Sequence, residues 1–169
     1  MRGRATLNHT YPSYKYFERR IDIYKNKYLQ GRYNTLNEAS TRLIVNHLLS
    51  DVFLYKELDQ YKVEPFIGGM FFDYAVQANG KILLVIEVKQ RGMKFNFDHI
   101  LQVMTYALSS RSRFAMVTDG DMIILFELNP IYKRFGLKVK LKLRLSEVNK
   151  NQMKLLLSLI SINNLVAGV

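Results

Sequence analysis

The stretch from Phe71 to Lys89 constrains the fold more than any other part of the chain. Two apolar segments rich in branched and aromatic residues flank Asn79-Gly80, which is the composition of a β-hairpin with a tight turn. The first strand carries Asp73, and the second ends in Glu87 and Lys89. Charges in a buried strand cost free energy unless they are paired or bound to a metal ion. We therefore expect these charges to have a chemical role.

The spacing of these charges restricts the register of the two strands in the hairpin. Strand side chains alternate between faces, so Glu87 and Lys89 share one face. A strict two-residue turn would place Asp73 opposite Ile86, which would leave the two carboxylates on opposite faces. Because a shared metal ion requires both on one face, we predict a one-residue offset. The offset would be a bulge at Gly80 with a positive φ, or a wider loop.

Two carboxylates and a lysine in this arrangement suit Mg²⁺-dependent hydrolysis of a phosphodiester. Carboxylates supply hard oxygen ligands, and a lysine can face the phosphate and the attacking water. Asp73 and Glu87-Val88-Lys89 resemble the motif of the PD-(D/E)xK nuclease superfamily, which has the restriction-endonuclease-like fold. Phe72 departs from this motif, because the superfamily name has proline there.

The resemblance implies a set of site residues. Asp73, Glu87 and the Val88 carbonyl would bind Mg²⁺, with Mn²⁺ as a substitute, and Lys89 would be catalytic together with the two carboxylates. E-x-K is a short motif that a lysine-rich strand can carry by chance, so the supporting residues elsewhere in the chain matter.

Glu38 is the first supporting residue. A helix is predicted over residues 35–49, with Thr35-x-x-Glu38 as a capping box and Glu38 at ion-pair spacing from Arg42. The segment that begins at Asn37-Glu38 also resembles the start of the nuclease domain in type I restriction enzyme motor subunits. This resemblance implies that Glu38 is catalytic and binds the metal ion. The capping role remains the alternative.

Gln102 and Tyr106 are the second supporting feature. A helix is predicted from about 96 or 98 to 110, and these two side chains fall on one face of it, with Ile100, Leu101, Met104, Ala107 and Leu108 as the buried stripe. The Q-x-x-x-Y spacing resembles an element of RecB-like and type I restriction nucleases, which implies that both residues position the substrate. A polar helix face is the alternative.

The remaining elements are read from their local patterns. A strand is expected over 61–67 with Glu64 solvated in it, and Asp119-Gly120-Asp121 is expected to be an ordinary tight turn. Residues 137–145 alternate as a half-buried strand, with Val139, Leu141 and Leu143 inward. Ser146 is expected to cap a last helix over 147–163, whose inward residues are Met153, Leu156, Leu157 and Ile160.

The charge is concentrated at the two ends of the chain. Residues 1–32 carry eight Lys or Arg and two acids, residues 131–169 eight and one, and residues 33–130 nine and eleven. Basic flanks around an acidic centre are typical of a protein that binds nucleic acid. The expected phosphate-binding residues are Arg19, Arg20, Arg91, Lys94, Lys138, Lys140, Lys142 and Arg144. The alternatives are a basic protein with charged termini and a sheet edge protected by lysines.

Composition excludes several other classes of protein. The chain has no Cys, which excludes disulfides and thiolate zinc sites and fits an intracellular, cytoplasmic protein, in the host cytoplasm if the protein is viral. Its three His residues are scattered, so we expect no His-based zinc site. The first residues lack the apolar core of a signal peptide, and no apolar segment is long enough to span a membrane.

The order of elements predicts an α/β fold with a central mixed β-sheet flanked by helices. A restriction-endonuclease-like core is expected over 35–130. A basic arm and helix over 1–34 precede it, and a basic strand and helix over 131–169 follow and pack on the same domain.

The predicted function is that of a Mg²⁺-dependent nuclease acting on DNA. One alternative is a Holliday-junction resolvase of the same fold, which would be a two-fold dimer. An alternative of another class is a module that binds nucleic acid without cutting it. A second copy of the chain and a separate helicase are partners that this interpretation leaves open.

Overall fold

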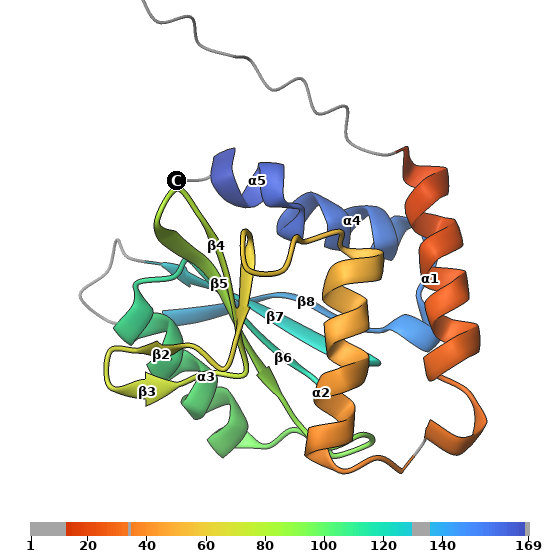
Figure 1. Ribbon diagram of the computed structural model, residues 1–169, viewed down its shortest axis with the longest axis horizontal. Helices are drawn as coiled ribbons and strands as arrows, with labels where there is room; N and C mark the ends of the chain where they lie inside the picture. The colour runs from red at the N-terminus through yellow and green to blue at the C-terminus, as the bar shows by residue number, and fades with distance from the viewer. Residues whose placement is uncertain (1–12, 34, 130–135, 168–169) are drawn as a thin grey trace, which may run out of the picture.

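A six-stranded mixed β-sheet forms the centre of the computed structural model, which describes residues 13–33, 35–129 and 136–167. The spatial order of the strands is β1 (Tyr61–Val63), β4 (Tyr74–Ala78), β5 (Lys81–Val88), β6 (Phe114–Thr118), β7 (Met122–Asn129) and β8 (Gly136–Arg144). β5 and β6 run parallel, and the other four neighbouring pairs run antiparallel. The central mixed sheet is the one that the sequence predicts (Figure 1).

Helices cover both faces of the sheet (Figure 1). One face carries α1 (Tyr14–Tyr28), α2 (Glu38–His47), α4 (Lys150–Ile160) and α5 (Ile162–Ala167). The other carries α3 (Phe97–Ser110) and a separate two-stranded hairpin of β2 (Phe66–Ile67) and β3 (Met70–Phe71). Short helical turns lie at η1 (Gly31–Tyr33), η2 (Leu48–Val52) and η3 (Leu145–Glu147). Each face of the sheet has its own apolar core, which confirms the predicted α/β class.

The segments that flank the predicted nuclease core pack into the same apolar cluster as the sheet. Phe17 and Ile21 from α1 and Leu156 from α4 belong to one cluster with Leu84 of β5. The four predicted inward residues of the last helix, Met153, Leu156, Leu157 and Ile160, are buried. The boundaries proposed near 34 and 130 stay predictions, and residues 1–12 of the predicted basic arm lie outside the described residues.

The β4–β5 hairpin contains the predicted one-residue offset, but at another place. Asn79 and Gly80 both have positive φ angles and form a two-residue turn between Ala78 and Lys81. The register shifts between Val76 and Gln77, where Leu83 is the extra residue on β5. Beyond the bulge Tyr74 pairs with Ile86, so Asp73 and Glu87 come to the same face. The expected bulge at Gly80 is wrong, because Asn79 and Gly80 form a regular two-residue turn and the extra residue is Leu83.

The strand expected over 61–67 is divided into two. Its first part, β1, joins the main sheet, whereas β2 pairs with β3 in the separate hairpin. Glu64 lies at the break with a positive φ of 46°, and its backbone N–H donates to the carbonyl oxygen of Asp73 at 2.9 Å. The break redirects the chain and brings Glu64 beside Asp73.

The cap of α2 differs from the prediction. Asn37 is the N-cap, and its side chain accepts a hydrogen bond from the Ser40 backbone N–H at 2.8 Å. Glu38 is therefore the first residue of the helix, and the capping box that begins at Thr35 is wrong. Asn competes well for this position because its short side chain reaches the N3 amide. Leu43 of this helix is 69% exposed.

The last helical region also begins later than predicted. Residues 145–147 form the turn η3, and α4 is capped by Asn149 in a capping box with Gln152. Ser146, the expected cap, instead donates to Asp121 from both its backbone N–H and its hydroxyl group. The helix ends at Ile160, and α5 follows after Ser161.

The predicted alternation of residues 137–145 is broken by a second bulge. Leu125 pairs with Leu141 and Phe126 with Val139, so Lys140 is the extra residue. Val139 is thereby turned to the face of Phe126 and is 55% exposed, against the expectation that it points inward. Lys138 opposes Glu127 and Lys142 opposes Ile124, so the four cations do not share one face.

Candidate active site

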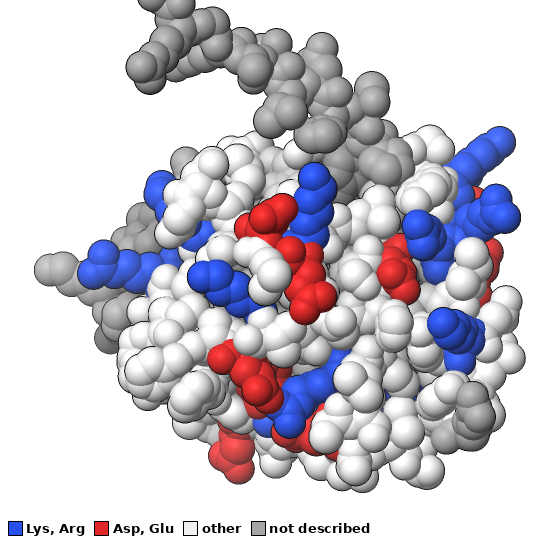
Figure 2. All heavy atoms as spheres, viewed as in Figure 1, with Lys and Arg blue, Asp and Glu red and all other residues white. Residues whose placement is uncertain are grey.

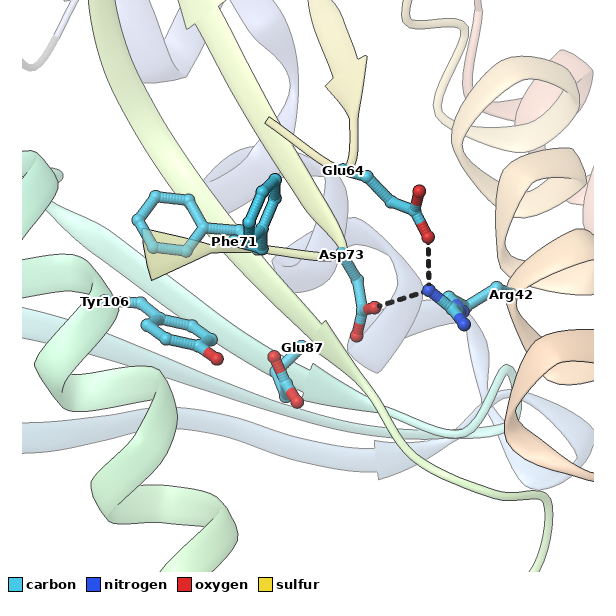
Figure 3. Close-up of a pocket in the computed structure, with 7 residues that line it drawn as sticks. Arg42, Glu64, Phe71, Asp73, Glu87 and Tyr106 are labelled. Carbon is cyan, nitrogen blue, oxygen red and sulfur yellow. Dashed lines mark hydrogen bonds and ion pairs between the residues drawn. The ribbon is translucent and has the colours of Figure 1, made fainter. Parts of the chain in front are cut away.

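A pocket of about 270 Å³ opens where β4 begins and β5 ends. Its lining combines charged and aromatic side chains, namely Arg42, Glu64, Phe71, Phe72, Asp73, Glu87 and Tyr106. Figure 3 shows Asp73 and Glu87 between two walls, with Phe71 and Tyr106 on one side and Arg42 and Glu64 on the other. The two motif carboxylates therefore face one cavity.

Asp73 is held at the start of β4 by two contacts. Its Oδ2 accepts a hydrogen bond from the Val88 backbone N–H at 2.7 Å, and its Oδ1 lies 3.4 Å from the Arg42 guanidinium. Arg42 makes a shorter ion pair of 2.6 Å with Glu64. The arginine is thus shared between two carboxylates and neutralises Asp73 only in part.

Glu87 and Lys89 form a buried ion pair that continues into α3. Lys89 Nζ lies 2.6 Å from Glu87 Oε1 and donates to Gln102 Oε1 at 3.0 Å. Gln102 Nε2 in turn donates to the Tyr106 hydroxyl group at 2.8 Å. The four predicted residues of E-x-K and Q-x-x-x-Y are therefore linked in one chain of contacts.

Both carboxylates are difficult to ionise in this setting. Burial raises the pKa of Asp73, against the lowering effects of the Val88 N–H and Arg42. Burial is also the largest influence on Glu87; together with the negative charge of Asp73 it raises the pKa of Glu87 to about 7, even though Lys89 lowers it. Two desolvated carboxylates that repel each other gain from a bound cation.

The residues present fit a Mg²⁺ ion with two carboxylate ligands. The Val88 N–H already points towards Asp73, and in a strand the carbonyl of the same residue points to the same edge. The described residues contain no group of three or more His, Cys, Asp or Glu side chains placed to hold a metal ion. Mg²⁺ needs no such group, because it binds through one or two carboxylates and keeps several waters.

Glu38 lies at the edge of the site and is exposed as the first residue of α2. Its negative charge contributes to raising the pKa values of both Asp73 and Glu87. Glu38 is therefore close enough to act on the site electrostatically, and its role as a metal ligand stays a prediction.

The expected phosphate-binding residues lie in different environments. Arg91, expected to bind phosphate, is instead buried, with its guanidinium 3.9 Å from Asp121. Lys94 is exposed in the loop before α3. Arg19 and Arg20 lie on α1, where Arg20 donates to the Tyr16 hydroxyl group.

The cations of β8 are partly engaged within the protein. Lys140 is paired with Glu127 at 2.8 Å and Arg144 with Asp121 at 3.2 Å, whereas Lys138 and Lys142 are exposed. On the face shown in Figure 2, acidic side chains lie among the basic ones, so this face has no continuous basic surface.

Four residues that line the pocket, Arg42, Glu64, Phe71 and Phe72, were not predicted from the sequence as site residues. Arg42 lies one helical turn after Glu38, so a site that includes Glu38 places Arg42 beside it. Phe71 lies two residues before Asp73, which is the spacing of side chains on one face of an extended segment. No sequence pattern indicated that Glu64 lines the pocket, because its position depends on its positive φ angle at the end of β1.

The fold and the pocket define an α/β protein with a half-buried aspartate and a buried glutamate where the inner strands β4 and β5 begin and end, respectively. No protein-family profile matches the sequence, and no curated protein sequence matches it. A type IIG restriction endonuclease, BpuSI, is structurally similar, with a TM-score of 0.44 and 15% identity over 94% of this chain. The match spans 18% of that endonuclease. A likeness at this level does not assign a function.

Within the described residues, none of the helices combines the length and apolarity that a membrane crossing requires.

Proposed function

We propose that this protein is a Mg²⁺-dependent nuclease that hydrolyses phosphodiester bonds in DNA. The observation that carries the proposal is the bulge in the β4–β5 hairpin. It brings Asp73 and Glu87 to one cavity, where burial raises both pKa values. The contacts of Asp73 and Glu87 within the fold do not fully offset the cost of their burial, and the pair gains stability from a divalent cation.

Each residue of the site has a distinct part in this proposal. Asp73, Glu87 and the Val88 carbonyl would hold Mg²⁺, with Glu38 as a further candidate ligand. When bound, the ion would polarise the phosphate and lower the pKa of a water molecule. The Val88 N–H orients Asp73 by its 2.7 Å hydrogen bond, so the ligand carboxylate is already positioned.

Lys89 would stabilise negative charge at the phosphate. Its ammonium group is buried and lies between Glu87 and Gln102, where a positive charge acts more strongly than in water. The contacts of Gln102 with both Lys89 and Tyr106 fix the direction of the lysine side chain. Gln102 and Tyr106 are therefore positioning residues in the proposed reaction.

Cleavage of labelled DNA tests the proposal. Single-stranded, duplex and four-way-junction substrates are incubated with Mg²⁺ or Mn²⁺, and with EDTA as the metal-free control. We expect metal-dependent cutting that Glu87→Gln and Asp73→Asn abolish. The matched control is Glu127→Gln, which removes a carboxylate paired with Arg113 and Lys140 outside the pocket.

The choice of substrate distinguishes the alternatives of the same fold. Selective cutting of the four-way junction by a dimer would identify a resolvase. Binding of DNA without cutting, with every substrate and both metals, would refute the nuclease proposal and support a binding module.

A further inference from the structure

The β2–β3 hairpin presents two aromatic rings to solvent beside the pocket. Phe66 and Phe71 are directly paired across the hairpin, and their ring centroids lie 4.9 Å apart. They are 63% and 66% exposed. Exposed apolar side chains that are in contact with each other mark interaction sites, whereas single exposed apolar residues are normal on protein surfaces.

The hairpin is packed against the body of the protein on its other face. Ile67 and Met70 are partly buried against the core below α3. At the tip, a Cβ atom on Gly68 would lie 3.3 Å from the Cβ of Ser109, which shows how closely the turn approaches the end of α3. The two phenylalanines therefore project from a supported element.

Backbone contacts connect the hairpin directly to the carboxylate site. Phe72 N–H donates to the Pro65 carbonyl oxygen at 3.2 Å, and Glu64 N–H donates to that of Asp73 at 2.9 Å. Phe72 is buried and packs on Tyr106, with ring centroids 4.6 Å apart. The position of Phe71 is thus fixed relative to Asp73, only two residues away.

The pocket has an aromatic side and a charged side. Phe71 and Tyr106 lie across Asp73 and Glu87 from Arg42 and Glu64 (Figure 3). A nucleotide has the same two parts, a flat base and a charged phosphate. A base can stack on an exposed ring only when it is unpaired and turned outwards, since the faces of bases in a duplex are covered by their neighbours.

We propose that Phe66 and Phe71 form a stacking platform for unpaired bases and that the substrate is single-stranded DNA. This inference rests on the proposed nuclease function and specifies its substrate. A base stacked on Phe71 places an adjoining phosphate at Asp73 and Glu87, because Phe71 lines their pocket. Phe66 extends the platform outwards for the next base.

Binding without cleavage tests the platform separately from catalysis. A fluorescein-labelled single strand and the same sequence as a duplex are titrated in EDTA, and binding is followed by anisotropy. A second single strand containing 2-aminopurine reports stacking by fluorescence quenching. The variants are Phe71→Leu and Phe66→Leu, which keep the apolar side chain but lose the ring, and Phe71→Trp, which keeps a ring. Leu155→Ala, an exposed residue of α4, is the control.

We expect Phe71→Leu to weaken single-strand binding about tenfold and to remove the quenching, with a smaller effect for Phe66→Leu. Phe71→Trp and Leu155→Ala should bind and quench like the wild type, and duplex binding should not change. Equal binding by Phe71→Leu and the wild type, or an equal loss for duplex and single strand, would overturn the proposal. Because no step requires cutting, a stacking signal without nuclease activity would reject the nuclease function alone.

Discussion

Two pairs of acidic residues in this protein, all buried except the half-buried Asp73, have opposite surroundings. At the Asp119-Gly120-Asp121 turn, Asp119 accepts hydrogen bonds from the backbone N–H groups of Gly92, Asp121 and Met122. Asp121 accepts from the Ser146 N–H and hydroxyl group, and it is paired with two arginines, Arg91 and Arg144. These carboxylates are fully used by the fold.

The pair in the pocket has far fewer donors. Asp73 is contacted by the Val88 N–H and a shared arginine, and Glu87 by Lys89. The pKa of Asp73 is raised and that of Glu87 reaches about 7, with burial as the first cause. The comparison separates carboxylates that stabilise the structure from carboxylates that remain available to a ligand.

The largest expected effect is the loss of activity on removing a pocket carboxylate. A metal ion supplies several kcal/mol of charge stabilisation, so Asp73→Asn should lower the DNA cleavage rate about 10³-fold or more. The thermal unfolding midpoint of Asp73→Asn in EDTA should stay close to that of the wild type. Active Asp73→Asn protein would show that the pocket pair is not the catalytic site.

Removing a turn carboxylate should have the opposite outcome, a loss of stability. Asp121→Ala removes the carboxylate beside the buried Arg91 and the acceptor of the Ser146 donors, which should lower the free energy of unfolding by about 3 kcal/mol. Chemical denaturation measures this change. Asp73→Ala is the matched variant, and an equal destabilisation of both would remove the distinction between the two pairs.

The raised pKa of Glu87 predicts a pH dependence of stability in the metal-free protein. The pKa is 4.5 in the reference state and about 7 in the fold, so the folded state binds more protons between these values. The stabilisation is complete below about pH 4.5 and is lost as the pH rises through about 7.

Glu87→Gln removes this titration. Relative to the variant, the wild type should lose about 2 kcal/mol of stability between pH 5 and 8 in EDTA. Denaturant titrations at several pH values measure the difference. Parallel curves for the two proteins would show that the carboxyl group is not desolvated.

The smallest expected effect concerns the exposed lysines of β8. Lys142→Ala should weaken DNA binding about threefold. It should also reduce the slope of the logarithm of the binding constant against the logarithm of the salt concentration by about one unit, as expected for one phosphate contact. Lys140→Ala should change the slope less, because Lys140 is already paired with Glu127. Identical slopes for both variants and the wild type would exclude β8 from the DNA interface.

The sequence contains much of the local information for this fold. Alternation and the Asn-Gly turn predict the hairpin, and the conflict of parity between Asp73 and Glu87 predicts an offset in it. Apolar periodicity predicts α3, but Leu101 and Leu108 of the expected buried stripe are exposed. The tight turn at Asp119 follows from residue type and is confirmed by the hydrogen bonds to its amide groups.

What the sequence does not reveal depends on non-local geometry. The positions of the two bulges, at Leu83 and Lys140, are set by how the strands pack. Each bulge shifts the register by one residue, so the side chains beyond it point to the opposite face of the sheet. Arg91 lies in a segment whose composition is typical of a surface loop, but its side chain is buried beside Asp121. Glu64 reaches the pocket through one backbone angle that composition does not encode.

Direct measurement of metal binding tests the central claim most closely. Mn²⁺ is titrated into the metal-free protein, and the free ion is followed by electron paramagnetic resonance, with Asp73→Asn, Glu87→Gln and Glu127→Gln alongside. We expect the wild type and Glu127→Gln to bind Mn²⁺ and the two pocket variants to lose this binding. Equal binding by all four proteins, or none by the wild type, would contradict this expectation.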